Sequence, residues 1–377
     1  MPDIVHLTTV HPRADVRILA KEARTLASGL GREVVLVVAD GLGSSGARDG
    51  GIAVYDVGKP PAGRLGRFVD GSRRALREIR RLEPRIVHFH DPELLPAALI
   101  LKACGYGVIY DIHEDVPRQI LSKHWISPAL RLPASWIVSA LEWLAARSFD
   151  GLIAATPKIA RRFPAQRTQV VQNFPILDEL VVQGAAPYAK RAPMFAYVGG
   201  ITAIRGAREM IEALEVLGPV ANVRLDIAGT FSPPGLHDEL SARPGWSRVT
   251  WHGHVGRAEV ARLLSEARAG LVLLHPVENY VESYPVKMFE YMAAGLPVIA
   301  SDFPLWREII EETRCGLVVD PRSHDAIAAA MRWMLDHPRE AEAMGRRGRE
   351  AVERAYSWNA EGARLIDLYR RVCSRYL

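Results

Sequence analysis

The chain has 377 residues, and 49% of them are hydrophobic, so it is a globular protein long enough for two domains. The formal net charge of +5 is mild and suits acidic ligands or an anionic surface. Three widely separated cysteines exclude a disulfide framework, and polar residues interrupt any leader-like or membrane-spanning apolar run. These observations favour a cytoplasmic protein.

Apolar runs and helix-like patterns alternate along the first half of the chain. Strands are predicted at 4–10, 33–39, 52–57, 85–89, 108–112, 151–154 and 169–172. The glycine-rich segment 41–46 formally matches a dinucleotide fingerprint, but a strand follows it where the fingerprint requires a helix. We therefore expect a flexible loop there, and a dinucleotide-dependent dehydrogenase is disfavoured.

Two helical stretches of the first half carry unusual surfaces. The segment 68–82 is strongly basic and holds Arg73, Arg74, Arg77, Arg80 and Arg81. A solvated face and attraction to anionic lipid headgroups are both open, whereas nucleic acid is disfavoured because no known binding motif accompanies the arginines. The segment 122–148 is amphipathic and rich in tryptophan, which predicts mainly core packing or contact with a membrane interface.

Histidines follow two neighbouring strands of the first half. His90 and Asp91 come directly after strand 85–89, and His113 follows strand 108–112. Side chains at the carboxyl ends of parallel strands face the ligand cleft of a doubly wound sheet. Histidines in such positions are candidates for function, whereas structural histidines are the alternative.

A glycine-rich turn opens the second half, after a polar linker at 184–193. Strand 195–198 leads into Gly199 and Gly200, and Arg205 follows before a helix. Such a turn lets the backbone approach a phosphate, and the planar guanidinium can bind one. A surface cap is the alternative role for the arginine.

The most informative stretch is 270–301, which reads as a strand, a loop, a helix and a second strand. Pro285 suits the first turn of the helix, and Lys287 and Glu290 lie one turn apart within it. A helix start at the carboxyl end of a parallel strand is an anion site. A phosphate there would meet Lys287 and the N–H groups of Tyr284 and Val286.

Two carboxylates flank this helix start, and they suit hydroxyl groups. Glu290 lies too deep for phosphates but can accept hydrogen bonds from two ribose hydroxyls. Glu282 precedes the helix, on the other side, and can bind the hydroxyls of a sugar. An ordinary surface loop and helix with scattered charges is the alternative interpretation of the same residues.

The same stretch resembles the signature of the retaining family-four glycosyltransferases of the GT-B fold. The resemblance consists of Glu282, seven residues, Glu290, and then the run from Tyr291 to Ser301. The Pro285-x-Lys287-x-x-Glu290 version is similar to a subgroup of bacterial polysaccharide and cell-surface transferases. The resemblance implies an α/β fold with two doubly wound Rossmann-like domains facing across a cleft.

The resemblance also implies domain bounds and site residues. The domains are an acceptor domain at 1–185, a nucleotide-sugar domain at 186–355 and a terminal helix at 356–377 that crosses back to the first domain. The implied catalytic residues are His113, Glu282, Arg205 and Lys287. The implied donor site comprises Gly199, Gly200, Arg205, Val255, Glu282, Ser283, Tyr284, Pro285, Val286, Lys287 and Glu290. The implied acceptor site comprises His11, Asp15, Arg17, His90, Asp91 and Glu114.

One position departs from the family pattern. Many members carry Arg where this chain has Gly200, and Lys where it has Arg205. The loop alone therefore lacks a second cation for a phosphate clamp, and Lys287 is expected to supply it.

The implied reaction is transfer of a hexosyl or N-acetylhexosaminyl group from a nucleoside diphosphate sugar to a hydroxyl, with retention at the anomeric carbon. UDP is favoured, the acceptor is a lipid-linked sugar or a small glycoside, and peripheral contact with the inner face of a membrane fits such an acceptor. No cofactor or metal is expected, because the chain has no Asp-x-Asp motif. A nucleotide-sugar 2-epimerase of the same fold and a non-catalytic nucleotide-sugar-binding subunit are the alternatives.

Overall fold

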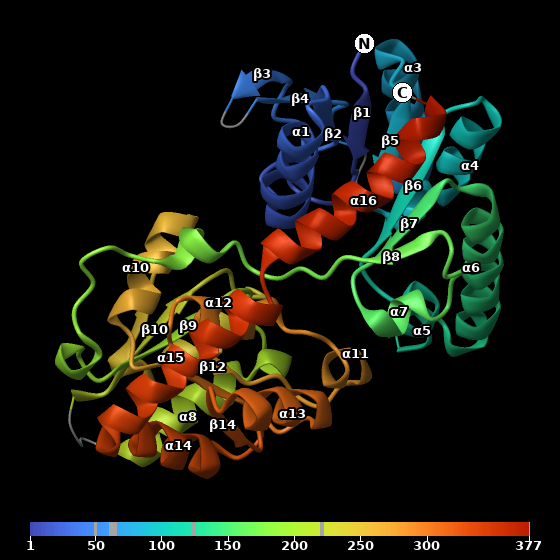
Figure 1. Ribbon diagram of the computed structural model, residues 1–377. Coiled ribbons are helices and arrows are strands. Elements are labelled where there is room, and N and C mark those ends of the chain that lie inside the picture. The colour runs from blue at the N-terminus through green and yellow to red at the C-terminus, as the bar shows by residue number, and fades with distance from the viewer. Residues whose placement is uncertain (49–50, 60–65, 123–125, 219–221, 377) are drawn as a thin grey trace. The chain divides into compact units, whose positions relative to one another are not determined.

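The computed structural model describes residues 1–48, 51–59, 66–122, 126–218 and 222–376. The chain forms two units, and each of them is built on its own sheet (Figure 1). Unit 1 comprises Met1–Asn173 and Asn359–Leu377, and unit 2 comprises Phe174–Trp358.

Unit 1 holds an eight-stranded sheet in the order β3-β4-β2-β1-β5-β6-β7-β8. Its strands are β1 (Ile4–Leu7), β2 (Val34–Val38), β3 (Ser45–Arg48), β4 (Ile52–Asp56), β5 (Ile86–Phe89), β6 (Gly107–Ile112), β7 (Gly151–Ala154) and β8 (Thr168–Val170). All neighbouring strands run parallel except β3 and β4. The all-apolar sequence of β2 is buried throughout, as a strand covered on both faces requires.

The edge strand β3 corrects the expectation of a flexible loop at 41–46. Ser45–Arg48 pairs antiparallel with β4, and the turn before it is held by the carboxylate of Asp56. That carboxylate accepts the N–H of Gly41 at 3.1 Å and the N–H of Gly43 at 2.7 Å. These tertiary hydrogen bonds order a segment whose glycines and serines have low strand propensity.

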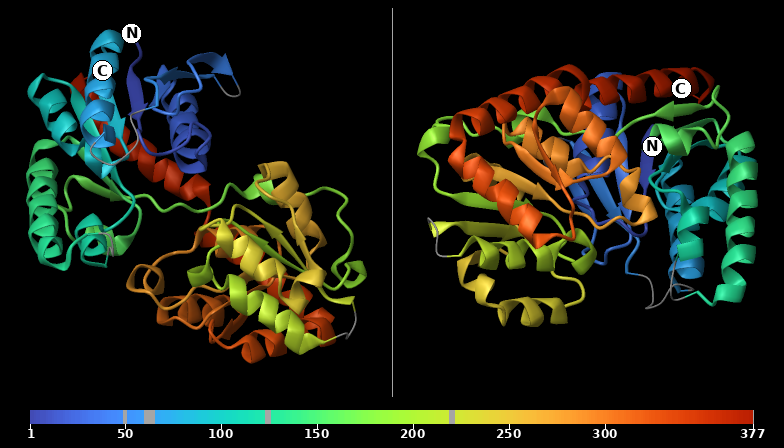
Figure 2. Two further views of the ribbon diagram at one scale, coloured as in Figure 1. Left: turned by 180° about the vertical axis from the view of Figure 1, so that it is seen from behind. Right: turned by 90° about the horizontal axis from the view of Figure 1, so that it is seen from below.

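Helices cover both faces of this sheet (Figures 1 and 2). They are η1 (Val16–Ala23), α1 (Arg24–Leu30), η2 (Arg67–Gly71), α3 (Ser72–Leu82), η3 (Pro92–Leu94), α4 (Leu95–Ala103), α5 (Val116–Ser122), α6 (Pro128–Ser148), α7 (Pro157–Ala160) and α16 (Trp358–Tyr376). On one face α3, α4 and α6 share a core with Val87 and Phe89 of β5. On the other face α16 meets His88 of the same strand through Tyr369. The alternation along β5 therefore separates an apolar layer from a polar one.

Unit 2 holds a six-stranded parallel sheet in the order β11-β10-β9-β12-β13-β14. The strands are β9 (Met194–Val198), β10 (Arg224–Ala228), β11 (Val249–Trp251), β12 (Ala269–Val272), β13 (Val298–Ser301) and β14 (Gly316–Val319). The central strands β9 and β12 are short and apolar, and they position the loops that follow their carboxyl ends.

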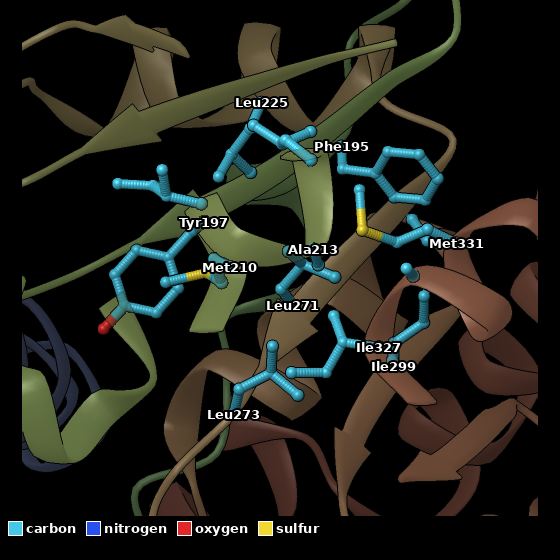
Figure 3. Close-up of a cluster of buried hydrophobic side chains, with 14 of the residues drawn as sticks. Phe195, Tyr197, Met210, Ala213, Leu225, Leu271, Leu273, Ile299, Ile327 and Met331 are labelled. Carbon is cyan, nitrogen blue, oxygen red and sulfur yellow. The ribbon is translucent and has the colours of Figure 1, made fainter. Parts of the chain in front are cut away.

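The helices of unit 2 enclose one hydrophobic core on each face of the sheet. They are η4 (Leu177–Leu180), η5 (Tyr188–Lys190), η6 (Ala203–Arg205), α8 (Ala207–Leu217), α9 (Gly235–Ser241), η8 (Pro244–Arg248), α10 (Arg257–Glu266), α11 (Glu278–Val281), α12 (Val286–Ala293), α13 (Pro304–Thr313), α14 (His324–Asp336) and α15 (Pro338–Ala355). Figure 3 shows the first core, where Phe195 and Leu271 of the sheet meet Met210 of α8 and Met331 of α14.

The division between the units differs from the expected boundary at 185. It falls after Asn173, because apolar residues beyond it already belong to the core of unit 2. The ring of Phe174 lies 4.9 Å from that of Phe289 and 5.3 Å from that of Tyr356. The polar linker at 184–193 is therefore internal to unit 2.

No helix in the described part of the chain combines the length and the apolar composition that crossing a bilayer requires. The prediction that the two sheets face one another across a cleft stays a prediction.

Candidate active site

The start of α12 is held against the carboxyl end of β9. Met288, Phe289 and Tyr291 on the inner side of the helix are fully buried. The hydroxyl of Tyr291 accepts a hydrogen bond from the N–H of Val198 at 2.9 Å. Pro285 precedes the helix in an extended conformation, one position before the first turn in which the sequence analysis placed it. The first turn of α12 consequently lies beside the glycine-rich turn that follows β9.

Gly199 and Lys287 meet at that turn. Gly199 adopts a φ of 127°, a conformation that residues with a side chain rarely adopt, and a Cβ there would lie 3.3 Å from Nζ of Lys287. The same Nζ lies 3.9 Å from the ring centroid of Tyr197. The ammonium group therefore points at the backbone turn and lies over an aromatic face.

The Lys287 ammonium nitrogen is sealed from solvent, and it has no hydrogen-bond partner among the residues that the structure describes. Burial lowers the pKa of Lys287 well below its usual value of 10.5, and the nearby charge of Arg205 adds to the shift. A buried, unpaired ammonium is costly unless an anion joins it. The arrangement consequently has the properties of an anion site.

Arg205 brings a second cation to the same turn. One of its terminal nitrogens lies 3.4 Å from the carbonyl oxygen of Gly200, and a Cβ on Gly200 would lie only 2.9 Å from that nitrogen. Burial opposes the charge, but a hydrogen bond with Tyr280 and the neighbouring Tyr197 raise the pKa of Arg205 overall. Lys287 and Arg205 therefore lie at the same turn, whereas the predicted phosphate clamp stays a prediction.

The loop before α12 carries the remaining donor-site candidates. Glu282 follows α11 and is exposed. Ser283 is bound to its own loop, because its hydroxyl donates to the carbonyl of Tyr280 at 2.9 Å and its carbonyl accepts from the indole of Trp306 at 2.7 Å. The ring of Tyr284 packs edge-on against Phe174. These contacts fix the loop and leave its acid outward.

Glu290 is buried, and it has a partner that sequence reasoning missed. Its carboxylate lies 2.8 Å from the guanidinium of Arg257, which also binds Glu179 at 2.9 Å. Arg257 begins α10, two residues after Val255, which packs against the second core of unit 2. No local pattern links an arginine at 257 to a glutamate at 290, because only the fold brings them together.

In unit 1, His113 is held by a buried carboxylate. Its Nε2 lies 2.7 Å from Oδ2 of Asp111, and Asp111 makes a bidentate ion pair with Arg17 at 2.8 and 2.9 Å. His90 reaches the same oxygen at 3.2 Å. Arg17 and the adjacent charges hold the pKa of Asp111 well below its usual range despite burial. The sequence analysis did not single out Asp111, which connects three residues that it did.

The other acceptor-side candidates are divided between exposed and bound groups. Asp91 is buried and accepts the hydroxyl of Thr8 at 3.0 Å, and Asp15 caps η1 through the N–H groups of Arg17 and Ile18. Burial would raise the pKa of Asp15, but the hydrogen bonds from His11 and Ile18 lower it to about 2. The carboxylate of Glu114 accepts a hydrogen bond from the side chain of Gln119.

Among the histidines of this region, two keep contact with solvent. The side chain of His11 is 31% exposed and that of His113 is 20% exposed, and their ring centroids lie 5.1 Å apart. The hydrogen bond with Asp15 raises the pKa of His11. A ligand at this edge of the sheet would meet these two rings first.

A second group of histidines, in the interior of unit 1, could hold a metal ion together with a glutamate. His6, Glu22, His88 and His90 bring ligand atoms within 4.8 Å of one another. Arg17 already lies 3.0 Å from Glu22, and burial raises the pKa of Glu22 well above its usual value. One proton on Glu22 makes the group neutral, whereas a divalent ion would leave excess positive charge in the interior. The cluster fits a proton better than a metal.

Two family models match most of the chain. A model described as Glycosyltransferase Family 4 matches residues 16–174, and one described as Glycosyl transferases group 1 matches residues 185–351. Together with the two Rossmann-like sheets, these matches define a retaining glycosyltransferase of the GT-B fold that uses a nucleotide-sugar donor. The chain belongs to glycosyltransferase family 4.

Two relatives share part of the sequence. The chain is 22% identical over 314 residues to MMP alpha-(1->4)-mannosyltransferase of Mycolicibacterium hassiacum, covering 76% of this chain and 71% of that protein. A shorter stretch of 90 residues, 24% of this chain and 23% of the relative, is 39% identical to a GDP-mannose-dependent phosphatidylinositol monomannoside mannosyltransferase of Mycobacterium tuberculosis.

Solved structures share the fold. Sucrose-phosphate synthase from Thermosynechococcus elongatus superposes with a TM-score of 0.73 at 18% identity, covering 99% of both chains. Anabaena Alr3699/HepE in complex with UDP-glucose gives a TM-score of 0.72 at 13% identity, covering 98% of this chain and 100% of that one. These similarities confirm the predicted GT-B fold.

Proposed function

We propose that the chain transfers a hexosyl or N-acetylhexosaminyl group from a UDP-sugar to an acceptor hydroxyl, with the diphosphate docked on Lys287 and Arg205. The buried ammonium of Lys287 carries this proposal, because it has no hydrogen-bond acceptor among the described residues. A diphosphate would supply that acceptor and complete the site. The first N–H groups of α12 lie beside it and favour the same charge.

Leaving-group stabilisation is the main catalytic work in this proposal. Negative charge develops on the diphosphate as the glycosidic bond breaks, and two fixed cations in a dry environment stabilise it. A single preorganised donor of this kind is worth roughly 10²–10³ in turnover. The cations would also take the place of a metal ion, so we expect activity to survive a chelator.

Glu290 and Arg257 form the nucleoside side of the proposed site. The guanidinium fixes one oxygen of the Glu290 carboxylate at 2.8 Å, and the carboxylate would accept two ribose hydroxyls. Backbone groups near Val255 would contact the base. Arg257 is then a positioning residue, because it acts through Glu290.

On the sugar and acceptor side, we assign direct contact to four groups that reach solvent, and support to four groups that are held by internal partners. His113, His11, Glu114 and Glu282 would meet the donor sugar or the acceptor. Arg17, His90, Asp15 and Asp91 were expected to bind the acceptor, but their internal partners favour a positioning role. The acceptor class stays a lipid-linked sugar or a small glycoside, which fits biosynthesis of polysaccharides, glycolipids or other glycoconjugates.

The choice of UDP is supported by one structural neighbour, Alr3699/HepE, whose structures contain UDP and UDP-glucose. The GDP-mannose-dependent relative shares a shorter stretch and makes GDP the competing base. Thermal shifts with UDP-, GDP- and dTDP-sugars would decide, since a ligand that binds the folded state raises the midpoint.

The test of the proposed function combines donor binding with product analysis. Lys287→Met should weaken UDP binding about 100-fold, equivalent to loss of one strong charged contact, whereas Lys190→Met on the surface of unit 2 should not. Equal affinity in the two variants would contradict the proposal. An epimerised sugar from donor alone would identify an epimerase, and binding without transfer or hydrolysis across an acceptor panel would identify a binding subunit.

A further inference from the structure

Helix α6 presents a long apolar surface to solvent. Its exposed side chains include Leu130, Leu132, Trp136, Ile137, Trp143 and Leu144, which we call the α6 stripe. Trp136 is 66% exposed and Ile137 is 62% exposed, so neither contributes to the core of unit 1. The helix spans 21 residues, and the stripe runs along most of it. Exposed apolar patches of this kind mark interaction surfaces.

Charges near the α6 stripe have one sign in the described part of the helix. Glu142 is the acid of α6, and it is buried and bonded to Arg162 at 2.6 Å. Arg147 is exposed, and its guanidinium lies 3.8 Å from the ring centroid of Trp143. The outward surface of α6 is therefore apolar with a cationic end.

The neighbouring helices extend this surface with further cations. α3, α4 and α6 form one layer on the same face of the sheet in unit 1 (Figures 1 and 2). Ile100 of α4 is exposed, and Arg73, Arg77 and Arg80 of α3 are exposed as well. The acid within α3, Glu78, is paired with Arg81. An arginine-rich margin therefore accompanies the apolar stripe.

We propose that the outer surface of α3, α4 and α6 docks on an anionic membrane surface, with the α6 stripe inserted at the level of the headgroups. Tryptophan and long apolar side chains are typical of that depth, and arginines beside them attract anionic lipid. Charge complementarity favours lipid over a second copy of the chain. A copy would present the same arginines, and among the described acids of these helices and their caps Glu78 and Glu142 are already paired, which leaves Glu83 after α3 as an exposed acid against the arginines.

Docking through unit 1 would bring the chain to a lipid-linked acceptor and leave the donor site of unit 2 unchanged. The docking proposal rests on the proposed function only for the reason why the chain would bind a membrane. Failure of vesicle binding is therefore distinguishable from failure of donor binding. UDP affinity serves as the separating measurement, since the α6 stripe contributes no residue to the proposed donor site.

The test is co-sedimentation with vesicles of phosphatidylcholine alone or mixed equally with phosphatidylglycerol. The full chain should bind the anionic vesicles and lose binding as salt rises. Ile137→Glu should lower the bound fraction at least tenfold, and Arg77→Glu should lower it less. Val216→Glu in α8 of unit 2 is the matched control, because Val216 is also exposed, and it should bind like the parent.

Three results would overturn the proposal. They are no binding to either vesicle, equal loss in Val216→Glu and Ile137→Glu, and a concentration-dependent dimer that Ile137→Glu abolishes in sedimentation velocity. Thermal midpoints and UDP affinities of all variants are measured alongside. Trp136→Ser provides a second, uncharged variant, so a folding defect in Ile137→Glu does not decide the outcome.

Discussion

Two regions of the molecule bury positive charge in opposite ways. In unit 1, the guanidinium of Arg17 is matched by the carboxylate of Asp111 at 2.8 Å and lies 3.0 Å from the side chain of Glu22. In unit 2, Lys287 buries its ammonium beside Arg205, and neither has a carboxylate within ion-pair distance among the described side chains. The first cluster is complete as folded, whereas the second is completed by a ligand.

The difference separates residues that stabilise the fold from residues that serve function. Removing one partner of a buried ion pair is costly, because it leaves the other partner as a charge that neither water nor a counter-ion stabilises. Removing a buried charge that has no partner relieves the same cost. Removing the partner of Arg17 in unit 1 should therefore lower stability, whereas removing the charge of Lys287 in unit 2 should lower ligand affinity without lowering stability.

The largest expected effect is on stability, in unit 1. Asp111→Asn removes the ionised partner of Arg17 and should lower the free energy of unfolding by about 3 kcal/mol, as loss of a buried partner does. Denaturant titration measures it. The matched control is Asp40→Asn, which removes a partly exposed ion pair with Arg13 and should cost less than about 1 kcal/mol. If the two variants lost the same free energy of unfolding, the buried pair would stabilise unit 1 no more than a partly exposed pair does.

The next effect is on function, in unit 2. Lys287→Met should reduce UDP affinity about 100-fold, as loss of a charged contact does, yet the free energy of unfolding should be at least that of the parent. The reason is that methionine fills the same space without an unsolvated charge. Calorimetry and denaturant titration on one sample measure both. A clear loss of stability would show that the ammonium is a structural group.

The sequence predicted much of unit 2, because its signals are local. The helix start at Pro285, the glycine turn at Gly199 and the two cations are all visible in short segments, and they meet in the structure. These residues lie at ends of adjacent parallel strands, where topology alone brings neighbours together. Local pattern and fold therefore point to the same place.

Unit 1 was harder to predict because its important contacts are between distant segments. Arg17 and Asp111 come from different elements, and nothing near either one shows that they pair. An arginine beside a predicted ligand site looks the same in sequence whether a carboxylate or a substrate neutralises it. The partner of Glu290, which is Arg257, was missed for the same reason.

A smaller effect would test the positioning role of Arg257. Arg257→Ala frees the carboxylate of Glu290 from its fixed orientation and should weaken UDP binding about tenfold, the loss expected for one charged hydrogen bond. Arg257→Lys should restore part of it. The effect should appear in nucleoside binding and be absent with inorganic diphosphate, since Glu290 faces the ribose in the proposed site. Equal loss with both ligands would contradict that role.

The smallest effect concerns protons. The pKa of Lys287 lies below 10.5 in the folded chain, so between the two values the unfolded chain binds the additional proton and stability rises with pH. A bound diphosphate favours the charged ammonium, so binding should take up a fraction of a proton in that window. Calorimetry in two buffers of different ionisation enthalpy measures it. Lys287→Met should show no such uptake.

The close approach of Gly200 and Arg205 couples these two positions. A side chain at 200 would displace the guanidinium, since its Cβ would lie 2.9 Å from a terminal nitrogen. That nitrogen is the far end of a flexible side chain, so a residue with a side chain at 200 would be accommodated by movement of Arg205 rather than of the backbone. The residue at 200 therefore decides where the guanidinium of Arg205 can stand, and with it the position of the second positive charge at this turn.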